Sequence, residues 1–198
     1  MSLQVIPDPV FPEVLHVRTR RHGDARGWFT EVYSEAAFQK AGIPGRFVQD
    51  NHSRSEHAGT FRGLHFQAPP HAQAKLVRCV RGRILDVVVD IRKGSAGYGR
   101  SSAFEISAED GAQVYVPEGF AHGFCTLEPG TEVAYKVTAY YARDCDFGLA
   151  FDDPSLAITW PYPAGQLTLS DRDRAHPRLA ELPAYFNAGL ASTVKARP

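Results

Sequence analysis

The sequence has no long hydrophobic run, no Cys-x-x-Cys pair and no excess of charge of either sign. No stretch approaches the roughly 18 apolar residues of a membrane helix. The N-terminus also lacks the basic and then apolar pattern of a signal peptide. We therefore expect a cytoplasmic protein with no membrane partner. The three cysteines, Cys79, Cys125 and Cys145, are expected to be reduced, two of them in the core.

The charge balance excludes a further class of partner. Lysine plus arginine and aspartate plus glutamate number 22 each, so the net charge is zero and wholesale binding to nucleic acid is not expected. A local basic pocket for a phosphate remains compatible with this balance. Hydrophobic residues make up 43% of the 198 residues, which argues for one folded domain spanning 1–198.

Helical periodicity is nearly absent from the chain. One short helix is predicted over residues 34–41, with Ser34 as N-cap and Gly42 at its end, and a shorter one near 175–184. The remaining pattern predicts short strands, which indicates an antiparallel sandwich or jelly roll. The candidate strands are residues 47–53, 61–67, 75–80, 83–92, 102–106, 113–116, 123–127 and 132–140.

The segment 83–92 shows the clearest strand alternation. One predicted face carries only apolar side chains and is expected to be core. The other face includes Asp86 and Asp90 and is expected to be partly polar.

Polar side chains share faces on three of the predicted strands. His65 and Gln67 fall on one face of their strand, with Arg62 on the other. Gln49 and Asn51 share a face of a second strand, and Lys75 and Cys79 share a face of a third. A polar face of this kind is costly in a sealed core unless every group is paired. The pattern therefore favours a wet pocket, with a fully paired polar core as the alternative.

The absence of several known motifs excludes some kinds of chemistry for such a pocket. Pro117-x-Gly119-x-x-His122 resembles the second motif of cupins, but the His-x-His and glutamate of a metal-binding first motif do not accompany His65. No metal is therefore expected. The sequence also has no Gly-x-Ser-x-Gly, no GxGxxG and no Walker loop, which counts against nucleophilic, dinucleotide and ATP enzymes.

Acid–base chemistry fits the side chains that are present. A histidine can abstract a proton, a lysine can stabilise negative charge on a neighbouring oxygen, and a tyrosine can return a proton. His65, Lys75 and Tyr135 supply these three groups on three predicted strands. A carboxylate would orient the histidine, but residue spacing alone does not choose it.

The ordered motifs from about residue 23 to 173 resemble the dTDP-4-dehydrorhamnose 3,5-epimerase family. No single motif would be specific, but together they are. They are Asp24-x-Arg26-Gly27-x-Phe29-x-Glu31, Gln49-Asp50-Asn51-His52-Ser53, Arg62-Gly63-Leu64-His65-Phe66-Gln67, Lys75-Leu76-Val77-Arg78-Cys79, the segments 86–92 and 117–124, Tyr135-Lys136, Tyr140-Tyr141, Asp152-Asp153-Pro154, Trp160-Pro161 and Leu169-Ser170-x-x-Asp173. Two departures are His22 and Phe151, where the family often has other residues.

The resemblance implies an all-β fold, a cupin-type double-stranded β-helix (jelly-roll) barrel with a few short peripheral helices. It also implies a homodimer that needs neither metal nor cofactor. The substrate would be a dTDP-4-keto-6-deoxy sugar, dTDP-4-dehydro-6-deoxy-D-glucose, inverted at C3 and C5 to dTDP-4-dehydro-L-rhamnose for dTDP-L-rhamnose biosynthesis. The N-terminal segment 5–12, which is rich in proline, would add to a neighbour's sheet.

The family's functional positions transfer to this sequence residue by residue. His65 matches the base, Asp173 its carboxylate partner, Lys75 the group that stabilises the enolate, and Tyr135 the proton donor on the opposite face. The expected substrate-binding residues are Arg26, Glu31, Gln49, Asn51, Arg62, His122 and Tyr140, the last near the nucleotide base.

Two alternatives stay open at this point. One is a relative that inverts only C3 or only C5 of a related keto sugar. The other is a non-catalytic or metal-dependent cupin, against which the absent metal triad counts.

Overall fold

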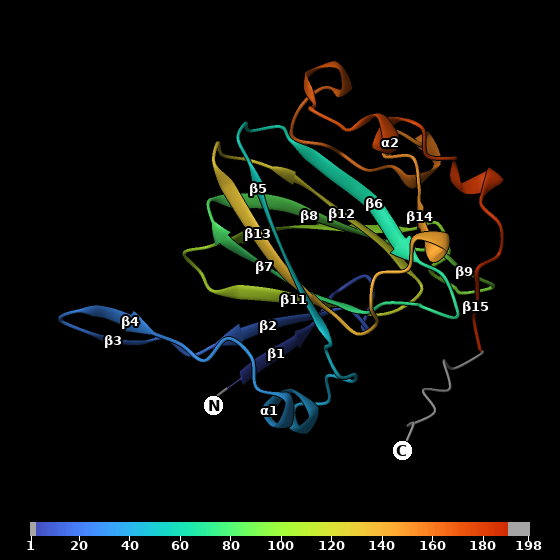
Figure 1. The fold of residues 1–198 in the computed structure, drawn as a ribbon. Helices are drawn as coiled ribbons and strands as arrows, with labels where there is room; N and C mark the ends of the chain where they lie inside the picture. The colour runs from blue at the N-terminus through green and yellow to red at the C-terminus, as the bar shows by residue number, and fades with distance from the viewer. Residues whose placement is uncertain (1–2, 190–198) are drawn as a thin grey trace.

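The computed structural model describes residues 3–189 as two antiparallel sheets packed face to face (Figure 1). A six-stranded sheet has the order β1 (Leu3–Pro7), β2 (Leu15–Thr19), β11 (Ala112–Val116), β7 (Lys75–Arg81), β13 (Thr131–Val137) and β5 (Gln49–Ser55). A five-stranded sheet has the order β10 (Ser101–Ser107), β8 (Arg83–Asp90), β12 (Phe120–Thr126), β6 (Phe61–Gln67) and β14 (Asp146–Gly148). The predicted jelly-roll class is confirmed.

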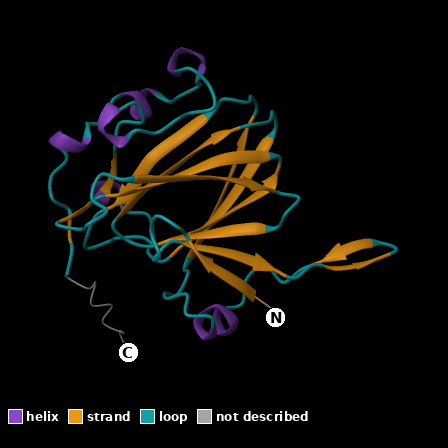
Figure 2. Ribbon diagram, turned by 180° about the vertical axis from the view of Figure 1, so that it is seen from behind, coloured by secondary structure: helices purple, strands orange, loops and turns teal. Residues whose placement is uncertain are grey.

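The remaining elements are short and peripheral, and the helices lie around the edges of the sandwich (Figure 2). They are the hairpin β3 (His22–Asp24) and β4 (Gly27–Phe29), the parallel pair β9 (Arg92–Lys93) and β15 (Phe186–Asn187), the helices α1 (Glu35–Lys40) and α2 (Asp171–Arg174), and 3-10 turns at Arg143–Cys145, Pro154–Leu156, Ala164–Gln166 and Leu179–Glu181. In the described part of the chain, no helix is long and apolar enough to cross a bilayer.

The two helix predictions had different outcomes. The helix predicted over residues 34–41 is confirmed as α1, with Ser34 as N-cap and Gly42 in a left-handed conformation just after its end. The helix predicted near 175–184 is wrong. The chain instead forms α2 four residues earlier, because the Ser170 side chain accepts a hydrogen bond from the backbone N–H of Asp173 and caps it. Only a 3-10 turn, Leu179–Glu181, lies in the predicted range.

Three hydrophobic clusters organise the packing. One fills the space between the sheets, and one lies under α1 on the outer face of the six-stranded sheet. The third covers the outer face of the five-stranded sheet, where Val87 and Val89 of β8 meet Leu149 and Leu156 of the C-terminal segment. The C-terminal segment is therefore part of the core and holds α2 in a fixed place beside the sheet.

The expected partly polar face of β8 is buried because it turns the other way, toward the six-stranded sheet, with Ile84 and Val88 in the cluster between the sheets. Asp86 and Asp90 are both 0% exposed, so this face is partly polar as expected but is fully buried. Each buried carboxylate instead has a cationic or titratable partner. Asp86 bonds His122 at 2.9 Å, and Asp90 bonds the Arg92 guanidinium at 2.8 Å. Burial of these carboxylates is tolerated because they are paired.

A β-bulge between β6 and β12 sets the direction of the side chains on β6. His122 lies opposite His65 and Phe124 lies opposite Arg62, so two β6 residues face Gly123 alone. Simple alternation would place Arg62 and His65 on opposite faces. The bulge breaks that alternation, and both side chains line the same cavity.

The N-terminal strand pairs within its own chain. β1 forms an antiparallel ladder with β2 and occupies one edge of the six-stranded sheet. The first part of the expected extended segment is present as this edge strand, and its addition to a neighbour's sheet stays a prediction.

We predict that Gly123→Ala destabilises the protein by about 1–3 kcal/mol, because a Cβ forced into a packed strand crossing causes strain. The added Cβ would lie 2.8 Å from the carbonyl oxygen of Arg62 and 2.9 Å from the Cα of Gly63. Urea unfolding would measure the loss. Gly165→Ala is the matched control, since an added Cβ there meets nothing within 4 Å and stability should not fall.

Candidate active site

The predicted acid–base residues line one cavity of about 470 Å³, where side chains from the two sheets face each other. β6 contributes His65, β7 contributes Lys75, β13 contributes Tyr135, and α2 contributes Asp173. Because the two sheets approach the cavity from opposite sides, a molecule bound there would contact His65 and Tyr135 from different directions.

His65 and Asp173 form a short contact at this cavity. Nε2 of His65 lies 2.6 Å from Oδ1 of Asp173, whose side chain is only 5% exposed. Burial would raise the pKa of the Asp173 carboxyl, but the adjacent His176 and His65 imidazoles and the Ser170 side chain hold it well below its usual range. Asp173 is therefore a carboxylate at neutral pH.

The pKa of His65 is lowered from its ordinary value of 6.5, mainly because burial disfavours the imidazolium. The hydrogen bond and charge of Asp173 act in the opposite direction, and the positive charge of Lys75 adds to the lowering. His65 is consequently neutral at pH 7. With its Nε2–H donated to Asp173, it carries its free lone pair on Nδ1.

Lys75 is a buried cation beside this pair. Its Nζ donates a hydrogen bond to the backbone carbonyl of His65 at 3.0 Å, which leaves further N–H groups available. Burial lowers its pKa to about 8, and the carboxylates of Asp146 and Asp86 oppose that shift. Lys75 therefore remains charged at pH 7, although it loses its proton far more readily than a surface lysine.

Tyr135 lies on the opposite sheet from His65. Burial raises the pKa of its hydroxyl, and Asp146 adds to this effect while Arg62 opposes it. Tyr135 is therefore a protonated phenol that can donate to a group in the cavity.

Two further predicted residues complete the wall near Tyr135. His122 lines the cavity and is fixed by its 2.9 Å contact with buried Asp86. Arg62 donates to the Ser55 hydroxyl and the Arg54 carbonyl, each at 3.2 Å, and also lines the cavity.

A second cavity of about 470 Å³ adjoins the first, and the two share His65, Lys75, Tyr135 and Arg172. Gln49 and Asn51 line this second cavity, where the Gln49 amide donates to the Asn51 carbonyl at 2.9 Å. The Arg172 guanidinium spans the boundary and pairs with Asp146 at 2.6 Å. The two cavities together form one elongated site centred on the His65–Lys75–Tyr135 group.

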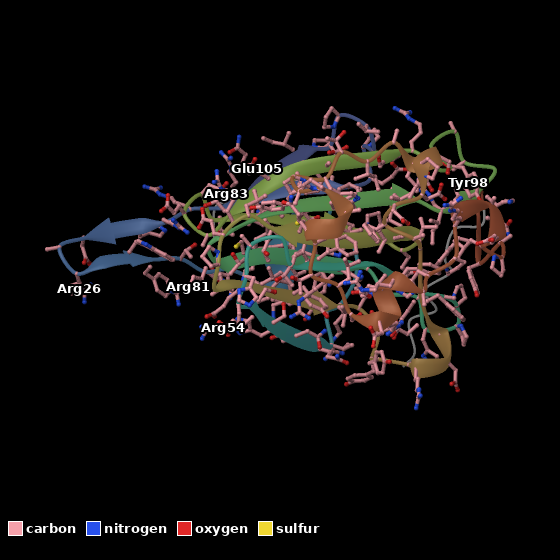
Figure 3. All side chains as sticks on the ribbon, turned by 90° about the horizontal axis from the view of Figure 1, so that it is seen from above. Arg26, Arg54, Arg81, Arg83, Tyr98 and Glu105 are labelled. Atoms are coloured by element: carbon pink, nitrogen blue, oxygen red, sulfur yellow. The ribbon has the colours of Figure 1, made fainter. Side chains whose placement is uncertain are left out.

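Three of the predicted binding residues lie outside these cavities. Arg26 sits at the tip of the β3–β4 hairpin, which projects away from the sandwich (Figure 3), with its side chain 90% exposed and paired to Asp24. Glu31 follows the same hairpin and is exposed. Tyr140 is 69% exposed, and the neighbouring Tyr141 lines the second cavity in its place.

Sequence reasoning overlooked several polar residues of the site. Asp86 could have been suspected, because a carboxylate inside an apolar strand requires a buried partner. His176 follows Asp173 at i,i+3 spacing, which brings side chains together on a helix. Its Nε2 lies 3.6 Å from Oδ1 of Asp173. For Asp146 and Arg172, which flank the cavities, the sequence pattern carries no comparable signal.

We predict that Asp173→Asn lowers the pKa of His65 further, because both the charge and the hydrogen bond of Asp173 favour the imidazolium. An NMR titration of the His65 ring would measure the change. Asp171→Asn, an exposed change on the same helix turn, serves as the control and should leave the titration in place. An unchanged or raised His65 pKa in Asp173→Asn would contradict this electrostatic description.

Comparison with known proteins gives consistent results. A family described as dTDP-4-dehydrorhamnose 3,5-epimerase matches residues 9–181. An enzyme of that name from Sinorhizobium fredii is 51% identical over 174 residues, which cover 88% of this chain and 89% of the relative.

Solved structures agree in fold as well as in sequence. The Bacillus anthracis dTDP-4-dehydrorhamnose 3,5-epimerase with TDP and pyrophosphate bound is 45% identical, with a TM-score of 0.85, over 89% of this chain and 99% of that one. The Legionella pneumophila dTDP-6-deoxy-D-glucose-3,5-epimerase, in complex with dTDP-4-keto-L-rhamnose, is 38% identical, with a TM-score of 0.87, over 92% and 96% of the two chains. The resemblance seen in the sequence is confirmed: the chain belongs to the dTDP-4-dehydrorhamnose 3,5-epimerase family of isomerases.

Proposed function

We propose that the protein inverts C3 and C5 of dTDP-4-dehydro-6-deoxy-D-glucose by acid–base chemistry and so forms dTDP-4-dehydro-L-rhamnose for dTDP-L-rhamnose synthesis. The observation that carries this proposal is the convergence of the His65–Asp173 pair, Lys75 and Tyr135 on one cavity. Relatives with TDP and with a dTDP-keto sugar bound support a nucleotide-sugar substrate.

Proton abstraction is assigned to His65. Asp173 accepts the Nε2–H of the ring and thereby presents the Nδ1 lone pair to the substrate. The hydrogens on C3 and C5 are acidic because both carbons neighbour the 4-keto group. When His65 takes one of them, the C–H electron pair becomes part of an enolate, and the new imidazolium is stabilised by the Asp173 carboxylate.

Lys75 stabilises that enolate, and Tyr135 completes the inversion. The enolate oxygen carries the developing charge, and the buried ammonium of Lys75 supplies a hydrogen-bond donor and a positive charge to it. Tyr135 then delivers a proton to the face opposite His65, since the two residues reach the cavity from different sheets. Return of the proton to the opposite face inverts the carbon.

The nucleotide and diphosphate are assigned to the residues around this centre. The guanidinium of Arg62 suits the diphosphate, and Gln49, Asn51 and His122 offer hydrogen-bonding groups along the two cavities. Tyr140, whose side chain is exposed, is assigned as a contact for the base.

We assign a homodimer to explain how Arg26 and Glu31, which lie far from the cavities of their own chain, would contact substrate. The hairpin β3–β4 projects from the sandwich (Figure 1) and exposes Trp28 and Phe29, which is unfavourable for an isolated chain. We assign this hairpin to contact with a second copy, where Arg26 would reach the partner's substrate. Sedimentation velocity should give twice the 21.8 kDa of one chain, and a monomer at micromolar concentration would contradict the assignment.

A cytoplasmic location is part of the same proposal. The described cysteines are free, and Cys79 and Cys125 are buried, which suits a reducing compartment.

The direct test is proton NMR of the keto sugar with purified protein in D₂O. Deuterium should enter both C3 and C5, and a reductase should capture the L-lyxo product. Exchange at one carbon alone would identify a single-centre epimerase. Absence of exchange at both carbons would overturn the proposal and favour a sugar-binding protein.

We predict that Tyr135→Phe preserves exchange at the first carbon but slows completed inversion by about 10²–10⁴-fold, the usual contribution of a general acid. The same D₂O experiment separates the two steps. Equal loss of exchange and inversion would show that Tyr135 is not simply the proton donor.

The rate of epimerisation, plotted against pH, should have a rising limb and a falling limb. It should rise through the pKa of His65, which lies below 6.5, because only the neutral ring is a base. It should fall above about pH 8, where Lys75 loses its charge. Lys75→Arg should move the upper limb to higher pH, since a guanidinium stays protonated. An upper limb that does not move would show that another group causes it.

A further inference from the structure

A second histidine lies behind the His65–Asp173 pair and neither takes nor gives a proton in the chemistry described so far. The His176 side chain is only 9% exposed, and its ring meets the His65 ring edge-on, with centroids 5.4 Å apart. Its place depends on Gly148, because a Cβ at that position would overlap the imidazole. The ring is therefore held in a fitted slot beside the catalytic pair.

The Nε2 atom of His176 is buried and has no hydrogen-bond partner among residues 3–189. It lies 3.6 Å from the same Oδ1 of Asp173 that His65 approaches to 2.6 Å. A buried polar nitrogen without a partner is costly, and its presence calls for an explanation. The Asp173 oxygen beside it already accepts a hydrogen bond from His65. The Nε2 lone pair of His176 is therefore available to a ligand held between the two imidazole rings.

We propose that His65, Asp173 and His176 form a site for a divalent transition-metal ion such as Zn²⁺, and that a bound ion switches the enzyme off. The three donor atoms, two imidazole nitrogens and a carboxylate oxygen, all lie within 4.8 Å of one another. This donor set is one that zinc prefers, and three protein ligands leave a fourth position open toward the cavity.

The distances suit an ion after a small movement. Bonds of about 2.0–2.2 Å place tetrahedral ligand atoms about 3.3 Å apart, so the His65–Asp173 contact must open by about 0.7 Å. The His176–Asp173 distance of 3.6 Å already has the required size. His65 can move most easily, because its side chain is 31% exposed at the cavity wall.

The inhibitory effect follows from the position of the single ring proton of His65. In the active form, His65 carries its proton on Nε2 and its lone pair on Nδ1. An ion bound at Nε2 takes the Nε2 lone pair, so the neutral ring must carry its proton on Nδ1 instead. The base is then lost without any change in net ring charge. The ion is thus an inhibitor of the proposed function, distinct from a cofactor, and this inhibitory step rests on His65 being the base.

Cobalt binding tests the site without any substrate. Untagged protein is titrated with Co²⁺, whose visible absorption reports nitrogen and oxygen ligation, and Zn²⁺ is used to displace it. Wild type should bind one ion per chain, and His176→Asn should bind it on the order of 10–100-fold more weakly. His57→Asn, which removes an exposed histidine elsewhere, should bind as wild type does. Equal cobalt affinity in wild type and His176→Asn would overturn the site.

Deuterium exchange then tests the inhibition. Without metal, His176→Asn should exchange the C3 and C5 hydrogens as fast as wild type. The Zn²⁺ concentration that inhibits wild type should be on the order of 10–100-fold lower than the concentration that inhibits His176→Asn. EDTA should restore activity, and Mg²⁺, which prefers oxygen ligands, should not inhibit. If His176→Asn does not fold, His176→Gln replaces it. Zinc that occupies the cluster without slowing exchange would refute the inhibitory role, whereas the cobalt experiment decides the site even if the sugar is not a substrate.

Discussion

The hydrogen bond between His65 and Asp173 joins the two parts of the molecule on which the site depends. His65 belongs to a central strand of the five-stranded sheet, and Asp173 belongs to the C-terminal segment that covers that sheet. The bond forms because Leu149, Leu156 and their neighbours bury the covering segment and fix α2 beside β6. The free energy of hydrophobic packing thus offsets the cost of burying the Asp173 carboxylate away from water.

The electrostatics of the site follow from this burial. Shielding keeps His65 neutral and lowers the pKa of Lys75 to about 8, while hydrogen bonds keep Asp173 ionised. A neutral base, a charged lysine and a protonated Tyr135 therefore coexist at pH 7. Each is in the protonation state that removal and return of a carbon-bound proton requires. The same closeness that makes this pair effective also brings His176 near enough to form a metal site.

Much of the fold was predictable from the sequence, because strand alternation is a local property of each segment. The cavity was harder to predict, since it depends on contacts distant in sequence. The β6 bulge, which turns Arg62 to the side of His65, arises from the close approach of β12. Asp173 could be assigned only through the family resemblance, because 108 residues separate it from His65. Arg26 illustrates the limit, since nothing in one chain brings the hairpin tip to the cavity.

The most direct test of the central claim is deuterium exchange by His65→Ala, measured at C3 and C5 of the keto sugar and compared with wild type. If His65 is the base, exchange at both carbons should fall by about 10²-fold or more, while dTDP binding, followed in parallel, should persist. Exchange at the wild-type rate would contradict the account, because the proton would then leave to a group other than His65.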